Sequence, residues 1–236
     1  AALKVVEEIR AAGGEAMSNG GNVAEYDQMV ELVAKAKEAW GSVHILINNA
    51  GILSDKSFTK MEIADFELVV KVHLLGSANA TKAVWDMMRE QNYGRILMTA
   101  SSTGLYGNFG QTNYGAAKLG LAGLTKSLYL EGAKYNVKVN TLAPIAATRM
   151  TEDILPPEAF KAFDPVNVVP AALFLVSDDA PSNAIVGAGG GFFHTANVTL
   201  TRGIALPEGE RTVEAVAAHW AEISDRTGET VPQSGA

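Results

Sequence analysis

The sequence predicts an α/β fold in which a doubly wound parallel sheet lies between layers of helices. Short apolar segments typical of buried strands alternate along the chain with longer segments of helical periodicity. The 236 residues are enough for one large domain of this kind, and they contain no internal repeat and no low-complexity run. We therefore expect one α/β core that contains most of the chain.

The first half of the chain is predicted to contain three helices and one strand. The apolar residues Met29, Val33 and Trp40 recur at helical spacing and define the buried face of an amphipathic helix. A longer helix carries apolar residues from Phe66 to Val84. We place the helices at residues 1–10, 26–40 and 63–90, and the strand at residues 43–47.

The second half of the chain continues the alternation. An Asn-Tyr-Gly turn that starts at Asn92 leads into a buried strand, and a glycine-rich loop follows that strand. The next helix has small residues along one side, and a later helix begins near Pro165. We place strands at residues 95–100, 137–142 and 184–187, the last being the final strand of the core, and helices at residues 113–133 and 168–176.

Charge, composition and cysteine content exclude several classes of protein. The net charge is −7 and there is no basic stripe, which argues against a nucleic-acid partner. No segment reaches the roughly 18 apolar residues of a membrane span. The absence of cysteine excludes disulfides and thiolate metal sites, and the 4 histidines lack metal-ligand spacing. With no visible signal peptide, we expect a cytoplasmic protein.

The strongest chemical signal is the group formed by Ser101, Tyr114 and Lys118. A tyrosine and a lysine four residues apart share one face of a helix. A phenol loses its proton near pH 10, and a nearby ammonium favours the phenolate and moves the pKa toward neutrality. A serine hydroxyl at the end of the preceding strand can hold a substrate oxygen beside the phenol. Although such a pair alone is more often packing, the strand, loop and helix around it favour proton exchange with a carbonyl or an alcohol.

In these three residues the chain resembles the short-chain dehydrogenase/reductase family, whose active-site pattern is a serine followed by Tyr-x-x-x-Lys. Two further family motifs match, Asn-Asn-Ala-Gly at residues 48–51 and Asn-Val at residues 22–23. The resemblance covers nearly the whole chain and implies a Rossmann-like, three-layer α/β/α fold. It is closer still to the (3R)-hydroxyacyl-CoA dehydrogenase unit of peroxisomal multifunctional enzyme type 2 and its single-domain bacterial relatives. The segments that carry this closer match are residues 4–10, 72–74, 106–111, 148–151 and 186–189.

The resemblance implies a role for each matched residue. Tyr114 would exchange a proton with the substrate oxygen, Ser101 would hold that oxygen, and Lys118 would lower the tyrosine pKa and bind the nicotinamide ribose. A threonine would bind the nicotinamide amide, and both Thr148 and Thr151 fit that place. The cofactor, NAD or NADP, would be contacted by Asn22, Val23, Asn49, Ala50, Gly51, Tyr114, Lys118 and Thr148.

The chain departs from the family pattern at three places. No Gly-x-x-x-Gly-x-Gly turn occurs in residues 1–236, so we expect an N-terminally incomplete fold that lacks the first strand–helix–strand unit and its pyrophosphate site. His73 stands where the family usually has an asparagine, as it also does in the closer subgroup. Pro144 is followed by Ile145 instead of the usual glycine.

Two segments lie outside the common core. Residues 148–165 contain three prolines and several large apolar residues, and their length without regular structure favours a lid over the substrate more than a plain surface loop. Residues 208–223 carry a helical apolar stripe that we expect to pack on the body or on a partner subunit. We place the main domain at residues 1–206 and a C-terminal helical extension and tail at residues 207–236.

The sequence therefore predicts an oxidoreductase that interconverts a secondary alcohol and a ketone, with a 3-hydroxyacyl thioester as the best substrate. A 3-oxoacyl carrier-protein reductase and a steroid or polyol dehydrogenase are alternatives among enzymes. A catalytically inactive dimerisation domain is the alternative outside them. We expect a homodimer, or a homotetramer of dimers, formed through the helices at residues 63–90 and 113–133, since the second of these is apolar nearly all round.

Overall fold

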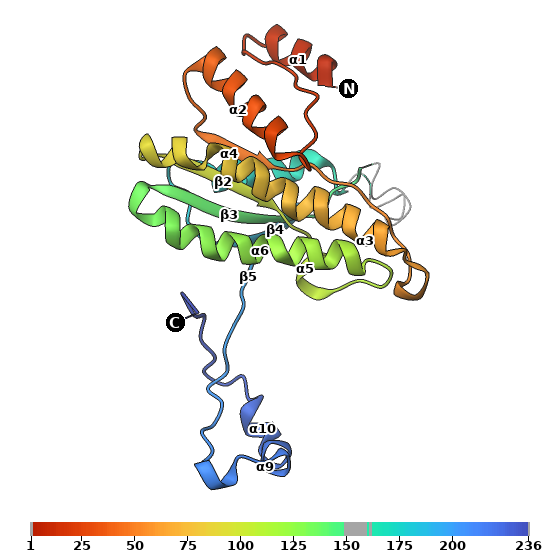
Figure 1. Ribbon diagram of the computed structural model, residues 1–236, viewed down its shortest axis with the longest axis vertical. Coiled ribbons are helices and arrows are strands. Elements are labelled where there is room, and N and C mark those ends of the chain that lie inside the picture. Colours follow the sequence, from red (N-terminus) through yellow and green to blue (C-terminus); the bar gives the residue numbers. More distant parts are fainter. Residues whose placement is uncertain (1, 149–159, 161, 236) are drawn as a thin grey trace. The chain divides into compact units, whose positions relative to one another are not determined.

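The computed structural model describes residues 2–148, 160 and 162–235. The chain divides into two compact units, Ala1–His194 and Thr195–Ala236. The first unit holds the sheet and the helices that cover it (Figure 1). The domain boundary predicted at residue 206 falls inside the second unit and stays a prediction.

Four strands of the sheet pair in parallel and in chain order. They are β1 (Ile45–Asn48), β2 (Gly94–Thr99), β3 (Val137–Pro144) and β4 (Ile185–Gly189). Every residue of β2 is buried, as expected for a central strand covered on both faces. The parallel α/β fold predicted from the sequence is confirmed, and because all four strands run the same way, their carboxyl ends meet at one edge of the sheet.

A fifth strand corrects the prediction that the core ends at β4. Strand β5 (Phe192–Ala196) follows β4 at the end of the sheet order. The two strands are joined by Gly190 and Gly191, whose φ angles of 58° and 80° suit the tight turns that glycine permits. Most of β5 is exposed, so it lacks the continuous apolar pattern that identified the other strands.

The helices largely match their predicted positions. The long helix expected at residues 63–90 consists of α3 (Ile63–Val70), a π-helical turn η2 (Lys71–Leu75) and α4 (Gly76–Glu90). A short helix, α5 (Ser102–Tyr106), lies in the segment expected to be a loop. The other helices among the described residues of the first unit are α1 (Ala2–Ala11), α2 (Tyr26–Trp40), α6 (Thr112–Gly132) and α8 (Val169–Leu175), with 3-10 turns η1 (Phe58–Lys60), η3 (Ala133–Tyr135) and η4 (Pro165–Val168).

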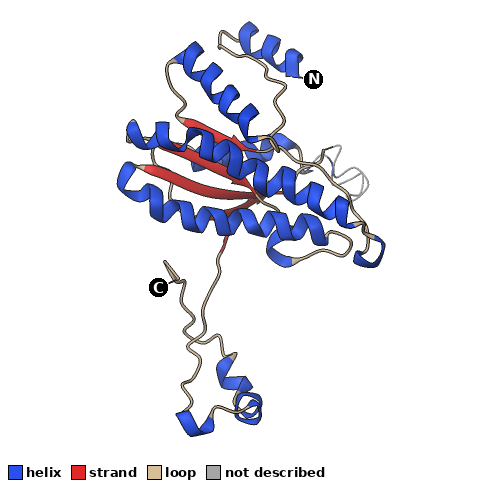
Figure 2. Cartoon of the chain, in the orientation of Figure 1, coloured by secondary structure: helices blue, strands red, loops and turns tan. Residues whose placement is uncertain are grey.

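Helices cover both faces of the sheet. Figure 2 shows α4 and α6 side by side over one face, where Ile96 and Met98 of β2 join the larger apolar cluster. Leu97 points to the opposite face and packs with Leu175 of α8. This alternation follows from the two-residue period of a strand. Because helices cover both faces of the sheet, we look for functional side chains at the strand ends.

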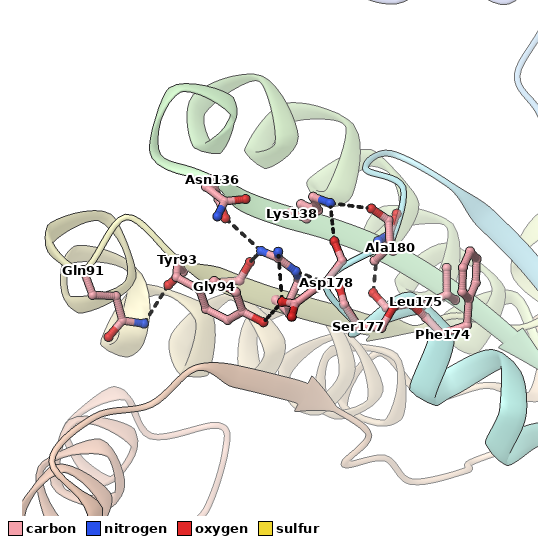
Figure 3. A network of polar contacts seen from close by, with 12 residues as sticks. Gln91, Tyr93, Gly94, Asn136, Lys138, Phe174, Leu175, Ser177, Asp178 and Ala180 are labelled. Atoms are coloured by element: carbon pink, nitrogen blue, oxygen red, sulfur yellow. Dashed lines mark hydrogen bonds and ion pairs between the residues drawn. The ribbon is translucent and has the colours of Figure 1, made fainter.

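A polar network closes the amino ends of the strands, as Figure 3 shows. Arg95 is 2% exposed, and its guanidinium donates to the carbonyl oxygens of Gly94 (2.8 Å), Asn136 (2.9 Å) and Ser177 (3.0 Å). The same group lies 4.2 Å from the ring centroid of Tyr93. Because it satisfies three backbone acceptors at once, Arg95 stabilises the end of the sheet that is remote from the strand carboxyl ends.

The second unit contains η5 (Glu208–Glu210) and two short helices, α9 (Val213–Ala218) and α10 (Trp220–Ile223), where the sequence predicted one helical stripe. The break falls at His219, whose φ of −96° and ψ of 12° leave the helical region. Val213 and Trp220 are exposed within the unit. Their packing on the body or on a partner stays a prediction.

Two further sequence predictions concern the lid and membrane-spanning helices. Most of the predicted lid, residues 149–159 and 161, lies outside the described residues. Among the helices of the described ranges, none combines the length and the apolar character that crossing a bilayer requires.

Candidate active site

A cavity of about 340 Å³ opens at the carboxyl ends of β1, β2 and β3. Ligands of open α/β sheets bind beyond this edge. The cavity brings together residues that are far apart in the sequence and that the sequence analysis selected for chemistry. Its lining consists of Asn49, Gly51, Leu53, His73, Thr99, Ala100, Tyr114, Lys118, Pro144, Ala146 and Thr148.

Lys118 is buried in the wall of this cavity, with 4% of its surface exposed. Its ammonium Nζ donates a short hydrogen bond to the carbonyl oxygen of Thr99, the last residue of β2. Burial lowers the pKa of Lys118 to about 8, so the ammonium remains the major form at neutral pH. Gly104 of α5 makes room for this residue, since a Cβ there would lie 2.7 Å from the Lys118 Cβ.

Tyr114 lies one helical turn before Lys118 on α6, and the Lys118 Nζ is 5.4 Å from its ring centroid. The expected lowering of the tyrosine pKa is wrong for this structure. Burial raises the pKa of Tyr114, and its hydrogen bond with Ser101 only partly opposes that change. The reason is that the phenol loses its hydration while the Lys118 ammonium is directed at Thr99. At neutral pH the Tyr114 phenol is therefore protonated.

Ser101 lies just after β2 and begins α5. Its Oγ accepts a hydrogen bond from the backbone N–H of Thr103 at 3.2 Å, the usual role of a serine at a helix N-cap. The same hydroxyl also interacts with the Tyr114 phenol and favours a lower pKa there, against the effect of burial. Ser101 is not part of the cavity lining given above, whereas Tyr114, with which its hydroxyl interacts, is.

His73 occupies the π-helical turn η2 and is 2% exposed. Its Nε2 lies 3.1 Å from the backbone N and 2.8 Å from the carbonyl oxygen of Ile52, and its ring meets that of Tyr114 edge to face at a centroid distance of 5.1 Å. Burial and the nearby Lys118 charge lower the pKa of His73 to about 4, so the imidazole is neutral at pH 7. Gly51 must be a glycine here, because a Cβ would overlap the imidazole.

The residues predicted to bind the cofactor are brought together only in part. Asn49, Gly51 and Thr148 line the same cavity as the Tyr114–Lys118 pair. Asn22 and Val23 lie instead near α4, where the Asn79 Nδ2 donates to the carbonyl oxygen of Val23 at 3.0 Å. Ala50 is exposed and, like Asn22 and Val23, is not part of that lining. Thr151 lies outside the described residues.

The cavity fits the nicotinamide end of a dinucleotide. The Lys118 ammonium has three donor hydrogens. One is donated to the carbonyl oxygen of Thr99, and the others can reach ribose hydroxyls. The amide of Asn49 and the apolar side chains of Leu53 and Pro144 add a polar contact and a surface for a flat ring. Sequence reasoning missed the Thr99 carbonyl, since a backbone acceptor leaves no trace in residue type.

Comparisons with known proteins agree with this geometry. A family profile described as short chain dehydrogenase matches residues 1–159. The chain is 46% identical over 226 residues to a short-chain type dehydrogenase/reductase of Mycobacterium tuberculosis, covering 95% of this chain and 79% of that protein. It is 43% identical over 235 residues to peroxisomal multifunctional enzyme A of Dictyostelium discoideum, covering 99% of this chain and 52% of that protein.

A shorter match and a solved structure extend the comparison. A 3-oxoacyl-[acyl-carrier-protein] reductase of Synechocystis is 41% identical over 155 residues, covering 65% of this chain and 63% of that enzyme. The full-length peroxisomal multifunctional enzyme type 2 of Drosophila melanogaster superposes with a TM-score of 0.85 at 35% identity. It covers all of this chain, which spans 41% of the Drosophila enzyme. The fold, the arrangement of Tyr114 and Lys118 and these similarities agree. The chain belongs to the short chain dehydrogenase family.

Proposed function

We propose that this chain is an NAD(P)-dependent dehydrogenase that interconverts a 3-hydroxyacyl thioester and the corresponding 3-oxoacyl thioester. The observation that carries the proposal is the convergence of Tyr114, Lys118 and His73 on one cavity, with the Ser101 hydroxyl interacting with the Tyr114 phenol. The relative named as a 3-oxoacyl-[acyl-carrier-protein] reductase supports the thioester class, and an acyl carrier protein in place of coenzyme A is the alternative carrier.

The chain's own residues would handle the proton of the reaction. In reduction, the Tyr114 phenol donates its proton to the substrate oxygen while the Ser101 hydroxyl holds that oxygen. In oxidation, the phenolate accepts the alcohol proton, and the Ser101 hydroxyl stabilises the negative charge. A bound nicotinamide supplies hydride exchange at the carbon, and Asn49, Lys118 and Thr148 would hold its ribose and amide.

The protonation state of Tyr114 favours one direction at neutral pH. Burial raises the pKa of the phenol, so the acid form needed for reduction is already present. The phenolate needed for oxidation becomes populated only as the pH rises. We therefore expect oxidation of the hydroxyacyl thioester to speed up with increasing pH, whereas reduction does not.

The decisive experiment replaces Tyr114 by phenylalanine in the full-length protein. Turnover of acetoacetyl-CoA with NADH and NADPH is followed by nicotinamide absorbance, and nucleotide affinity is followed by calorimetry. Loss of one general acid should lower kcat by about 10²–10⁴-fold, while nucleotide Kd stays within about twofold because Lys118 is untouched. Retention of more than half the wild-type kcat would remove Tyr114 from the chemistry. Turnover of other ketones but of no thioester would reject the substrate class alone.

We also propose a homodimer, or a tetramer built from such dimers, through α4 and α6. Supporting observations are the exposed leucines Leu119 and Leu130 on α6 and a groove of about 380 Å³ between the two helices, lined in part by Trp85 and Leu124. Gly123 sits on an outer face of α6 with open space around it. The cytoplasmic location stays a prediction, and the name of the Dictyostelium relative makes the peroxisome the location to test against it.

A further inference from the structure

Gln111 is a buried amide between the two segments that carry Ser101 and Tyr114. It lies immediately before α6 and is 6% exposed. Its Oε1 accepts hydrogen bonds from the Thr103 Oγ1 (2.9 Å) and the Asn108 Nδ2 (3.0 Å), and its Nε2 donates to the Asp55 Oδ2 at 2.7 Å. A buried side chain with three polar partners has one well-defined orientation.

The first of these bonds leads to Ser101. Thr103 uses its hydroxyl to reach Gln111 and its backbone N–H to reach the Ser101 Oγ at 3.2 Å. A displacement of Thr103 therefore moves the donor that fixes the rotamer of Ser101. Because Gln111 holds the Thr103 side chain, it also holds the N-cap of α5 on which Ser101 lies.

The backbone of Gln111 leads to Tyr114. Its carbonyl oxygen accepts from the N–H of Gly115 at 2.7 Å, which starts the hydrogen-bond ladder of α6. The same residue thus sets the first turn of the helix that carries the phenol. Asn113, which is fully buried, adds a parallel contact by donating to the carbonyl oxygen of Ser54 at 3.1 Å.

Asp55, an exposed residue, is the acceptor at the far end of the network. It lies on the loop after β1, and that loop is also joined to the α5–α6 connection by a backbone bond from the N–H of Lys56 to the oxygen of Gly110 at 2.9 Å. The Asp55 carboxylate can only accept hydrogen bonds, and the Thr103 hydroxyl donates one in this network. Only a side chain that donates on one side and accepts on the other can join the two, and the amide of Gln111 does both.

We propose that Gln111 is a positioning residue that fixes the Ser101 hydroxyl relative to the Tyr114 phenol, with Asp55 as its anchor. The inference rests on the proposed function, since it concerns the geometry of the same reaction. Gln111 touches neither substrate nor cofactor in this reading. Its effect should therefore fall on kcat, because a misplacement of about 1 Å at the reacting atoms costs on the order of 10²-fold in rate.

The test inverts the polarity of the Gln111–Asp55 contact in the full-length protein. Gln111→Glu keeps the shape of the side chain and its two incoming donors, but it sets one carboxylate against another. We expect kcat for acetoacetyl-CoA to fall about 10- to 100-fold, with nucleotide Kd unchanged. Adding Asp55→Asn supplies a donor to the new carboxylate, so the double variant should recover kcat to within about threefold of wild type.

Gln91→Glu is the matched control. Gln91 is another glutamine of the first unit whose Nε2 donates to two carbonyl oxygens, those of Val43 (3.0 Å) and Tyr93 (2.6 Å), at the opposite end of the sheet. It should lower Tm without lowering kcat. An unchanged kcat in Gln111→Glu, or a double variant no better than that single variant, overturns the positioning role while wild-type turnover upholds the proposed function. Absence of any Tyr114-dependent turnover in the wild type overturns both.

Discussion

His73 should make the folded protein lose stability in mild acid. Its imidazole is buried against Tyr114 and Ile52, and its pKa is lowered from 6.5 to about 4, first by burial and then by the Lys118 charge. Between these two values the unfolded chain binds a proton on this imidazole and the folded chain does not. Stability from this residue is therefore complete above pH 6.5 and is lost as the pH falls toward 4.

The size of the effect follows from the pKa difference. The free energy of unfolding should fall by about 1.4 kcal/mol for each pH unit within this window, and by about 3 kcal/mol over the whole window. The perturbation is His73→Asn, which keeps a polar side chain next to Ile52 and removes the titrating group. The variant starts from a lower stability at pH 7, because the smaller side chain leaves space, but its dependence on pH should be weaker than that of the wild type.

The assay is urea unfolding of the full-length protein at a series of pH values from 4 to 7, without nucleotide. Carboxylates titrate in the same range, so the quantity of interest is the difference in slope between the wild type and the variant. His44→Asn is the control, since His44 is exposed and does not line the cavity. Its ring packs against that of Tyr93 at a centroid distance of 5.9 Å. Equal slopes for wild type and His73→Asn between pH 4 and 6.5 would refute a buried neutral histidine.

Two other predictions concern parts of the molecule outside the cavity. Arg95→Met should lower the free energy of unfolding by about 3 kcal/mol, because three carbonyl oxygens lose the charged donor of a buried residue. Denaturant unfolding measures this change, and a loss of kcat in the folded variant would show that Arg95 also affects the active site. Gly123→Arg should turn the proposed dimer into a folded monomer in light scattering, since the glycine has open space around it in one subunit. A variant that keeps the wild-type mass would place the interface elsewhere.

Periodicity and residue spacing were enough to predict the architecture and the Tyr114–Lys118 pair. The strands β1 to β4 are short apolar segments, and the central strand β2 is buried along its whole length. Tyr114 and Lys118 share a helix, so their spacing alone put them on one face. The position of Ser101 after a buried strand predicted its place at the sheet edge, because the carboxyl ends of parallel strands coincide.

The protonation states of these residues depend on contacts between segments that are distant in the sequence. The phenol pKa is raised, against the sequence prediction, because burial depends on every segment that covers Tyr114. His73 stays neutral for the same reason, and Gly51 has to be a glycine because the imidazole comes from a helix that lies far along the chain. Gln111 matters through Asp55 and Thr103, whose approach no spacing encodes. Residue types and periods are local properties that a sequence records, whereas desolvation and hydrogen bonding between distant segments exist only once the chain has folded.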